Sequence, residues 1–256
     1  MTPNDRLKAE HRPEAIRRRL AAGRRPSYLG DAVLGAIDGC ITTFAVVAGV
    51  VGANLPRGVA VVLGLANLLA DGFSMAVSNY QRARSEGDVL AQARAVEEAH
   101  IRAIPQGERE EVRQIYAGKG FDGELLERIV EVITADRRRW VETMLTEEYG
   151  LGLHPPQPLR AALVTLAAFC AVGIIPLAPF LLPLALSPDR LFFASAACTA
   201  LAFFLTGAAK GLVLKQAVLA CALQTVALGG GAAALAYVVG AWLRDLAGGY
   251  PQGLAL

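Results

Sequence analysis

Residues 58–79 read GVAVVLGLANLLADGFSMAVSN, an apolar run long enough to cross a bilayer as one helix. A helix satisfies its own backbone hydrogen bonds, which hydrocarbon cannot do. Four further runs of similar character cover residues 32–54, 159–182, 191–214 and 216–243. Only 19% of the 256 residues are charged, against roughly a quarter in ordinary soluble domains. The sequence therefore predicts an all-α integral membrane protein with five transmembrane helices.

Charged residues gather in one segment, residues 81–157, between the second and third apolar runs. This segment contains 15 of the 23 acidic residues of the chain and 11 of its 25 basic residues. Proline and glycine breaks, together with helical spacing of apolar residues, divide it. They predict that the helix of residues 58–79 continues to about residue 103, and that helices follow at 108–117, 122–133 and 136–149. We expect a small helical domain inserted between transmembrane helices two and three.

Basic residues set the expected orientation in the membrane. Five arginines lie between residues 17 and 25, whereas Arg57 and Arg190 are the basic residues that the connections after spans one and three offer. The positive-inside rule places the N-terminus and the insert in the cytosol. The expected parts are a basic cytosolic arm (1–30), two spans (31–80), a cytosolic metal-binding domain (81–157), three spans (158–245) and a tail (246–256).

Several classes of function are disfavoured by the sequence. The formal charge of +2 and the lack of basic clusters with interleaved aromatics argue against nucleic-acid binding. The three histidines, His11, His100 and His154, are far apart, and no HExxH, Walker or Rossmann pattern is present. We therefore expect no enzyme and no prosthetic group, and an ion gradient as the energy source.

Acidic residues inside apolar spans indicate a function, because placing an ionisable side chain in lipid costs free energy. Asp31 and Asp38 lie seven residues apart on one helix face, and Asp71 and Met75 lie four apart on the next span. Carboxylates and a thioether are plausible ligands for divalent first-row metals, and buried carboxyls also hold protons. Metal and proton would then compete along a shared polar pathway. The alternative is an interhelical hydrogen-bond network with protonated aspartates, or with aspartates paired to Lys210.

A second group of potential ligands lies in the insert. Residues three or four apart share a helix face in three pairs: Glu97 and His100, Glu108 and Glu111, and Met144 and Glu148. Solvated surface is the ordinary alternative for charged residues on such helices. The pairs nevertheless predict a metal-binding domain if they converge.

Blocks along the whole chain resemble one family. They read DAVLGAIDGCITTFAVVAGVVGA (31–53), LGLANLLADGFSMAVSNY (63–80), AIPQGEREEV (103–112), MLTEEYGL (144–151), GIIPLAPFLL (173–182) and GGGAAALAYVVGAWL (229–243). In this order they resemble the vacuolar iron transporter family, from about Asp31 to Leu243.

That resemblance implies a five-span homodimer that exports Fe(II), and often Mn(II), from the cytosol in exchange for protons. The implied path follows the first two spans at the dimer interface, with Asp38 and Met75 binding metal and Asp31 at the inner side. The insert would collect metal through Glu97, Glu108, Glu111, Met144 and Glu148.

The chain also departs from the family pattern. His100 stands where the family commonly has another glutamate, Leu145 where a second methionine is frequent, and Ser27 and Asn67 where acidic residues occur. An imidazole lowers the negative charge of the site, which should favour iron, cobalt, nickel or zinc over manganese. The Ala/Arg/Gly-rich composition points to a bacterial plasma membrane, with a vacuolar membrane as the alternative. A metal-responsive sensor or scaffold that does not transport is the alternative function.

Overall fold

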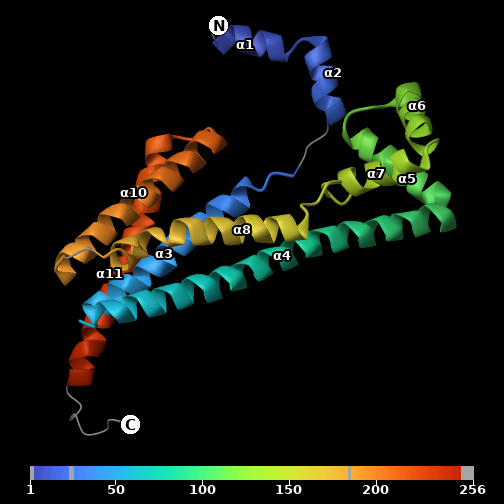
Figure 1. Cartoon of the computed structure of the whole chain (residues 1–256). Helices are drawn as coiled ribbons and strands as arrows, with labels where there is room; N and C mark the ends of the chain where they lie inside the picture. The colour runs from blue at the N-terminus through green and yellow to red at the C-terminus, as the bar shows by residue number, and fades with distance from the viewer. Residues whose placement is uncertain (1–2, 23–25, 184–185, 249–256) are drawn as a thin grey trace. The chain divides into compact units, whose positions relative to one another are not determined.

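The computed structural model describes residues 3–22, 26–183 and 186–248, and within these residues it contains helices but no strand (Figure 1). Arg24 and Arg25 of the predicted arm, and the tail beyond residue 248, lie outside the described residues. The elements are α1 (Pro3–Glu10), α2 (Pro13–Ala22), α3 (Leu29–Gly52), α4 (Arg57–Ala103), α5 (Pro105–Gly118), α6 (Gly123–Thr134), α7 (Arg137–Glu147), α8 (Pro158–Gly173), η1 (Ile175–Leu177), α9 (Ala178–Leu181), α10 (Pro188–Leu214) and α11 (Val218–Gly248).

Five helical segments are long and apolar enough to cross a bilayer, which confirms the predicted number of spans. They are Leu29–Gly52, Arg57–Ala103, Pro158–Leu181, Asp189–Leu214 and Val218–Leu246. The chain divides into two compact units. We call residues 28–82 with 157–256 the membrane unit, and residues 1–27 with 83–156 the insert unit.

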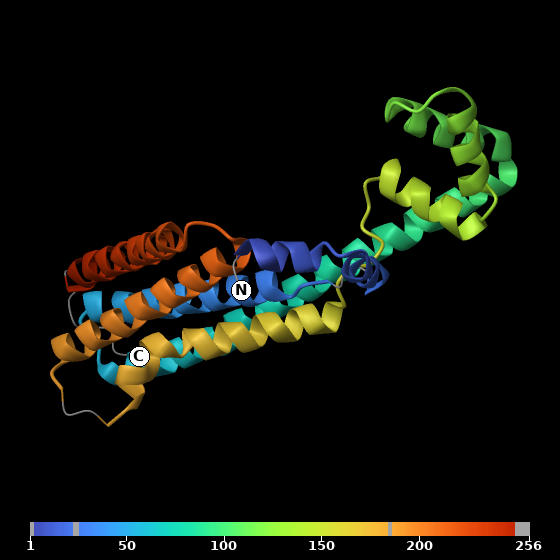
Figure 2. The same cartoon turned by 90° about the horizontal axis from the view of Figure 1, so that it is seen from above.

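The membrane unit is built around α3, which contacts α8, α10 and α11. Figure 2 shows these helices running alongside one another. Half of the apolar window of α3 is buried, against a third or less for the other four spans, so α3 is the central helix. Its C-terminal half forms an apolar core in which Phe44 and Val47 pack with Leu177, Phe180 and Leu191.

Glycines allow α3 to approach its neighbours backbone to backbone. A Cβ at Gly39 would collide with the carbonyl group of Phe169 in α8, and one at Gly52 would collide with that of Tyr237 in α11. Small residues of this kind let membrane helices pack closely. The position of α3 is therefore fixed from both sides by main-chain contacts.

The third span is interrupted, as its prolines predict. Helix α8 ends at Gly173, a 3₁₀ turn containing Pro176 follows, and α9 forms one short turn with Pro179 near its start. The Arg57 side chain donates to the carbonyl of Phe180 through Nε at 2.8 Å and also bonds to the Leu182 carbonyl. The guanidinium thereby satisfies carbonyl groups that a helix end leaves without an intrahelical partner.

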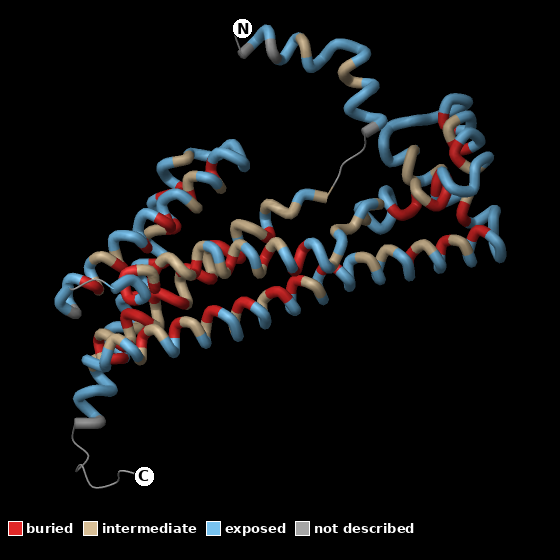
Figure 3. The backbone as a smooth tube through the Cα atoms, in the orientation of Figure 1, coloured by how far each residue is buried: buried red, intermediate tan, exposed pale blue. Residues whose placement is uncertain are grey.

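In the insert unit, α5, α6 and α7 surround an apolar core together with residues 83–103 of α4. Val112, Val130, Val141, Met144 and Leu145 are almost completely buried there. Figure 3 shows buried positions recurring on α5 and α7. Because the core belongs to this unit alone, it can position polar side chains independently of the membrane spans.

The structure corrects one predicted helix boundary in the insert unit and shows how the next two helices begin. Helix α5 begins at Pro105 instead of residue 108, because proline lacks the N–H that a first helical residue does not need. Asp122 occupies the N-cap of α6, but its side chain makes no cap hydrogen bond. Asp136 does cap α7, accepting from the backbone N–H of Arg139 at 2.9 Å.

Candidate metal-binding sites

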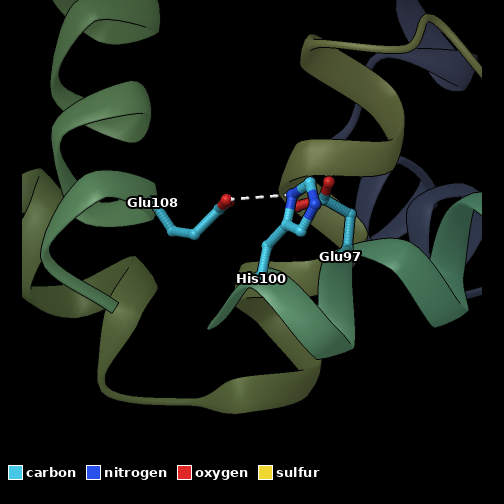
Figure 4. A group of neighbouring side chains, drawn as sticks. All are labelled: Glu97, His100 and Glu108. Carbon is cyan, nitrogen blue, oxygen red and sulfur yellow. Dashed lines mark ion pairs between the residues drawn. The ribbon is translucent and has the colours of Figure 1, made fainter. Parts of the chain in front are cut away.

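Three potential ligands meet in the insert unit, where α4 and α5 come together. Glu97 and His100 lie on one face of α4, and Glu108 lies in the first turn of α5. Figure 4 shows the Glu108 carboxylate pointing toward the imidazole of His100; Oε1 and Nδ1 are 3.3 Å apart. One ligand atom from each of the three residues lies within 4.8 Å of the others. Atoms that share one ion at about 2.1 Å are separated by at most about 4.2 Å, so small side-chain movements would close a site.

The two glutamates are placed where a cation would stabilise them. Glu97 and Glu108 are each only 1% exposed, whereas His100 is exposed. Oε2 of each glutamate is buried without a hydrogen-bond partner. A buried carboxylate without compensating contacts is costly, and a bound cation supplies the missing contact. The donor set of two carboxylates and one imidazole suits divalent first-row metals.

The electrostatics of the group reflect this burial. Burial of the carboxyl raises the pKa of Glu108 from 4.5 to about 7, and the charges of Glu97 and Glu111 add to the shift, while His100 opposes it. Burial also raises the pKa of Glu148, again with the charges of Glu97 and Glu111 adding. The exposed side chains of Glu111 and Glu148 therefore lie within electrostatic range of the buried glutamates.

Met144 and Tyr149 differ from the sequence-based picture of this group. Met144 is fully buried in the apolar core, beside Val141 and Leu145. Tyr149, which we did not predict, donates from its hydroxyl to Oε1 of Glu97 at 3.0 Å. A tyrosine directly after Glu148 gives no sequence signal for such a role, because the contact depends on how α7 returns toward α4.

Four basic side chains of the insert unit form ion pairs with carboxylates outside the metal group. The ion pairs join Arg113 to Glu110 and Glu127, Lys119 to Glu147, Arg128 to Glu131, and Arg138 to Glu142. Among the ion pairs of the described residues, the contact of Glu108 with His100 is the one that reaches the buried glutamates.

The membrane unit places the predicted acidic stripe on α3 and α4. Asp38 is half-buried, and its charge interacts with that of Asp71 on the neighbouring helix. Met75, one turn beyond Asp71, is half-buried as well. Thr42 donates from its hydroxyl to the backbone carbonyl of Asp38 at 3.0 Å. Two helices thus bring carboxyl groups into mutual range inside an apolar bundle.

Asp31 is buried near the start of α3 and has a basic partner. Nη2 of Arg82 lies 3.0 Å from Oδ1 of Asp31. The sequence suggested Lys210 as the basic residue beside the aspartates, but the partner of Asp31 is Arg82. Residue 82 lies just inside the predicted insert, and its spacing along α4 gives no signal for a contact with α3.

These features define a multi-pass helical membrane protein that carries acidic groups both within its spans and in a separate helical unit. The family model described as the VIT family matches residues 29–241, and the chain belongs to this family.

Named relatives cover most of the chain. A vacuolar iron transporter of Toxoplasma gondii is 33% identical over 229 residues, which are 86% of this chain and 76% of that protein. Vacuolar iron transporter 1 of Arabidopsis thaliana is 33% identical over 211 residues, covering 81% of this chain and 82% of the relative. A vacuolar iron transporter of Plasmodium berghei is 30% identical, covering 86% and 84%. These relatives lend no support to the expected bacterial plasma membrane.

Proposed function

We propose that this protein is a secondary transporter that moves Fe(II) out of the cytosol in exchange for protons. The observation that carries the proposal is the pair of half-buried carboxyl groups, Asp38 on α3 and Asp71 on α4, which lie within two apolar spans. Two such groups in an apolar bundle need protons or a cation to be stable together. The names of the relatives, all iron transporters, support iron as the metal.

The exchange follows from competition for the same oxygens. When protons occupy Asp38 and Asp71, their mutual repulsion disappears and no cation is required. When Fe(II) binds, its charge replaces the protons, and the thioether of Met75 adds a softer ligand. Protons released in this way leave as metal enters, and they return when metal leaves. A proton gradient can therefore drive metal transport without nucleotide hydrolysis.

The insert unit serves this transport by binding metal before it enters the spans. Glu97, His100 and Glu108 form the core of the metal group, with Glu111 and Glu148 adding negative charge nearby. In this proposal the arm and the insert face the cytosol, and the active protein is a homodimer in a vacuolar or other export membrane. The imidazole of His100 extends the range from Fe(II) toward Co(II), Ni(II) and Zn(II), with Mn(II) disfavoured.

Flux through sealed vesicles tests the proposal. The full-length protein is reconstituted in proteoliposomes, and uptake of Fe(II), Mn(II), Co(II), Ni(II) and Zn(II) is compared with and without a pH gradient. We expect Fe(II) uptake that accelerates when the vesicle interior is acidic, with proton movement in the opposite direction. Fe(II) uptake equal to that of protein-free vesicles would refute the assignment.

A metal-responsive sensor or scaffold is the second candidate, and one observation favours it. Glu97, His100 and Glu108 all belong to the insert unit, so metal can bind there without any participation of the spans. A sensor would bind Fe(II) with the affinity of that group but would give no pH-dependent flux in the same vesicles. The two measurements together separate the candidates.

A further inference from the structure

We infer that Arg82 is a built-in counter-cation for Asp31, which an incoming metal ion must displace, and that this exchange selects divalent over monovalent cations. The inference rests on the proposed transport function. It starts from the ion pair between Nη2 of Arg82 and Oδ1 of Asp31 at 3.0 Å. The Asp31 side chain is 11% exposed and that of Arg82 is 47% exposed, so the carboxylate is enclosed and the guanidinium reaches it from a more open side.

Arg82 is held in place by contacts that do not involve Asp31. Its Nε donates to Oδ1 of Asn79 at 2.8 Å. Asn79 is buried and donates from Nδ2 to Oγ1 of Thr165 at 2.7 Å and to the carbonyl of Ala161 at 3.2 Å. The chain of bonds therefore links α4 to α8 and positions the guanidinium in advance. A metal ion can take the Asp31 carboxylate while Arg82 keeps its anchor on Asn79.

The selection follows from the charges that are exchanged. A monovalent ion that replaces the guanidinium brings the same charge and loses the geometry of an oriented N–H···O bond, so it gains nothing. A divalent ion at a similar distance is attracted about twice as strongly, because Coulomb energy scales with charge. The guanidinium carries one positive charge, so exchange for Na⁺ or K⁺ brings no electrostatic gain. Abundant monovalent ions are thereby kept from the acidic pathway.

A purely structural role for Arg82 makes different predictions. A residue that only joins α3 to α4 would, on removal, lower the amount of active protein and leave the KM for Fe(II) unchanged. A counter-cation would, on removal, lower the KM and let K⁺ compete. Measuring KM and kcat separately for each variant therefore distinguishes the two roles.

The test measures Fe(II) uptake, with ascorbate keeping the metal reduced, in proteoliposomes of the full-length protein. K⁺ and choline buffers of equal ionic strength are compared. The variants are Arg82→Gln, Arg82→Lys and Arg82→Met, with Arg84→Gln as the matched control. Arg84 makes an exposed ion pair with Asp88 at 3.7 Å on the same helix. If Arg82→Gln does not reconstitute, Arg82→Met takes its place, because methionine keeps the aliphatic stem of the arginine.

We expect Arg82→Gln or Arg82→Met to lower the KM for Fe(II) about threefold, since the pair is partly exposed and exposed pairs are modest in strength. K⁺ should inhibit these variants and not the parent. Arg82→Lys should restore the parental KM and K⁺ resistance, and Arg84→Gln should match the parent. In the Asp31→Asn background, Arg82→Gln should have no further effect on the KM.

Three outcomes would overturn the inference. They are an unchanged or raised KM in the neutral variants, inhibition of Arg82→Lys by K⁺ to the same degree, and failure of both neutral variants to reconstitute while lysine succeeds. A parent without Fe(II) flux would refute the proposed transport and this selection with it. A parent with normal flux and a parent-like Arg82→Gln would refute the selection alone.

Discussion

The membrane unit and the insert unit both bury carboxyl groups, but they arrange them differently. In the membrane unit, Asp31 and Asp38 are separated by seven residues, about 10 Å along α3, and each interacts with a different group. In the insert unit, Glu97 and Glu108 converge with His100, and one ligand atom of each lies within 4.8 Å of the others. Carboxylates spaced along a helix suit an ion that passes from one to the next, whereas ligands that converge on one point suit an ion that stays bound. The following experiments examine this difference, beginning with the strongest expected effect.

Removal of a charge in the membrane unit should strongly reduce Fe(II) flux but leave Fe(II) binding by the insert unit unchanged. We expect Asp38→Asn to reduce Fe(II) flux by about a hundredfold, because loss even of groups that support a ligand costs about 10–100-fold. Equilibrium Fe(II) binding by the insert unit of the same full-length variant should stay at the parental affinity. Cys198→Ala, an exposed position on α10, is the control. Parental flux in Asp38→Asn would remove the distinction between the units.

Removal of charge in the insert unit should have the opposite pattern. The double variant Glu97→Gln with Glu108→Gln should lower equilibrium affinity for Co(II), an air-stable probe, by about 10–100-fold in calorimetry. Flux at saturating metal should change much less. Glu131→Gln, which disrupts only an exposed pair with Arg128, should behave as the parent. Loss of saturated flux equal to the loss of affinity would mean that the two units are not separable.

A smaller effect is expected for the hydroxyl that orients Glu97. Tyr149→Phe removes the 3.0 Å hydrogen bond to Oε1 without changing the ring. Metal affinity in calorimetry should fall about tenfold, as for other residues that orient a ligand. Tyr116→Phe is the matched control, since Tyr116 lies in the same unit beside Lys119. Equal affinities for the two variants would show that Glu97 needs no such support.

The smallest effect concerns the stability of the metal-free protein. The pKa of Glu108 is raised from 4.5 to about 7 on folding, so the folded chain holds this proton more tightly than the unfolded chain. The resulting stabilisation is full below pH 4.5 and is lost as the pH rises through about 7. Glu108→Gln stays neutral, so above about pH 8 its melting temperature should exceed that of the parent by about 2–4 °C.

Thermal unfolding in the presence of a chelator, followed by tryptophan fluorescence, measures this difference. Near pH 4 the two proteins should melt at nearly the same temperature, because the Glu108 carboxyl is then mostly neutral in both the folded and the unfolded chain. A constant difference between the variants at all pH values would contradict the assigned titration. Glu131→Gln again serves as the exposed control.

Local sequence signals were sufficient for the spans and for most of the insert helices. Apolar runs of about 20 residues predicted all five spans, and prolines 176 and 179 predicted the break in the third. The start of α5 differs from the prediction because proline marks helix ends but is also common in the first turn of a helix, where Pro105 lies. Such ambiguities arise wherever one residue type marks two kinds of boundary.

Contacts between helices were harder to predict than the helices themselves. The i,i+3 spacing placed Glu97 and His100 on one face, but only the turn at Ile104 brings Glu108 against them. The pairing of Arg82 with Asp31 joins residues 51 positions apart, and periodicity within one helix carries no information on such distances. Contacts between side chains of different helices therefore could not be predicted from this sequence alone.

Main-chain contacts at Gly39 and Gly52 have a further consequence for transport. A helix seated on the backbones of two neighbours cannot slide or rotate without driving atoms into each other, so α3, α8 and α11 should move as one rigid body. Helix α4 instead meets α8 and η1 through side chains at Gly72 and Gly64, which can change rotamer. If the proposed transport proceeds by alternating access, we expect α4 to tilt against a stationary scaffold of α3, α8 and α11.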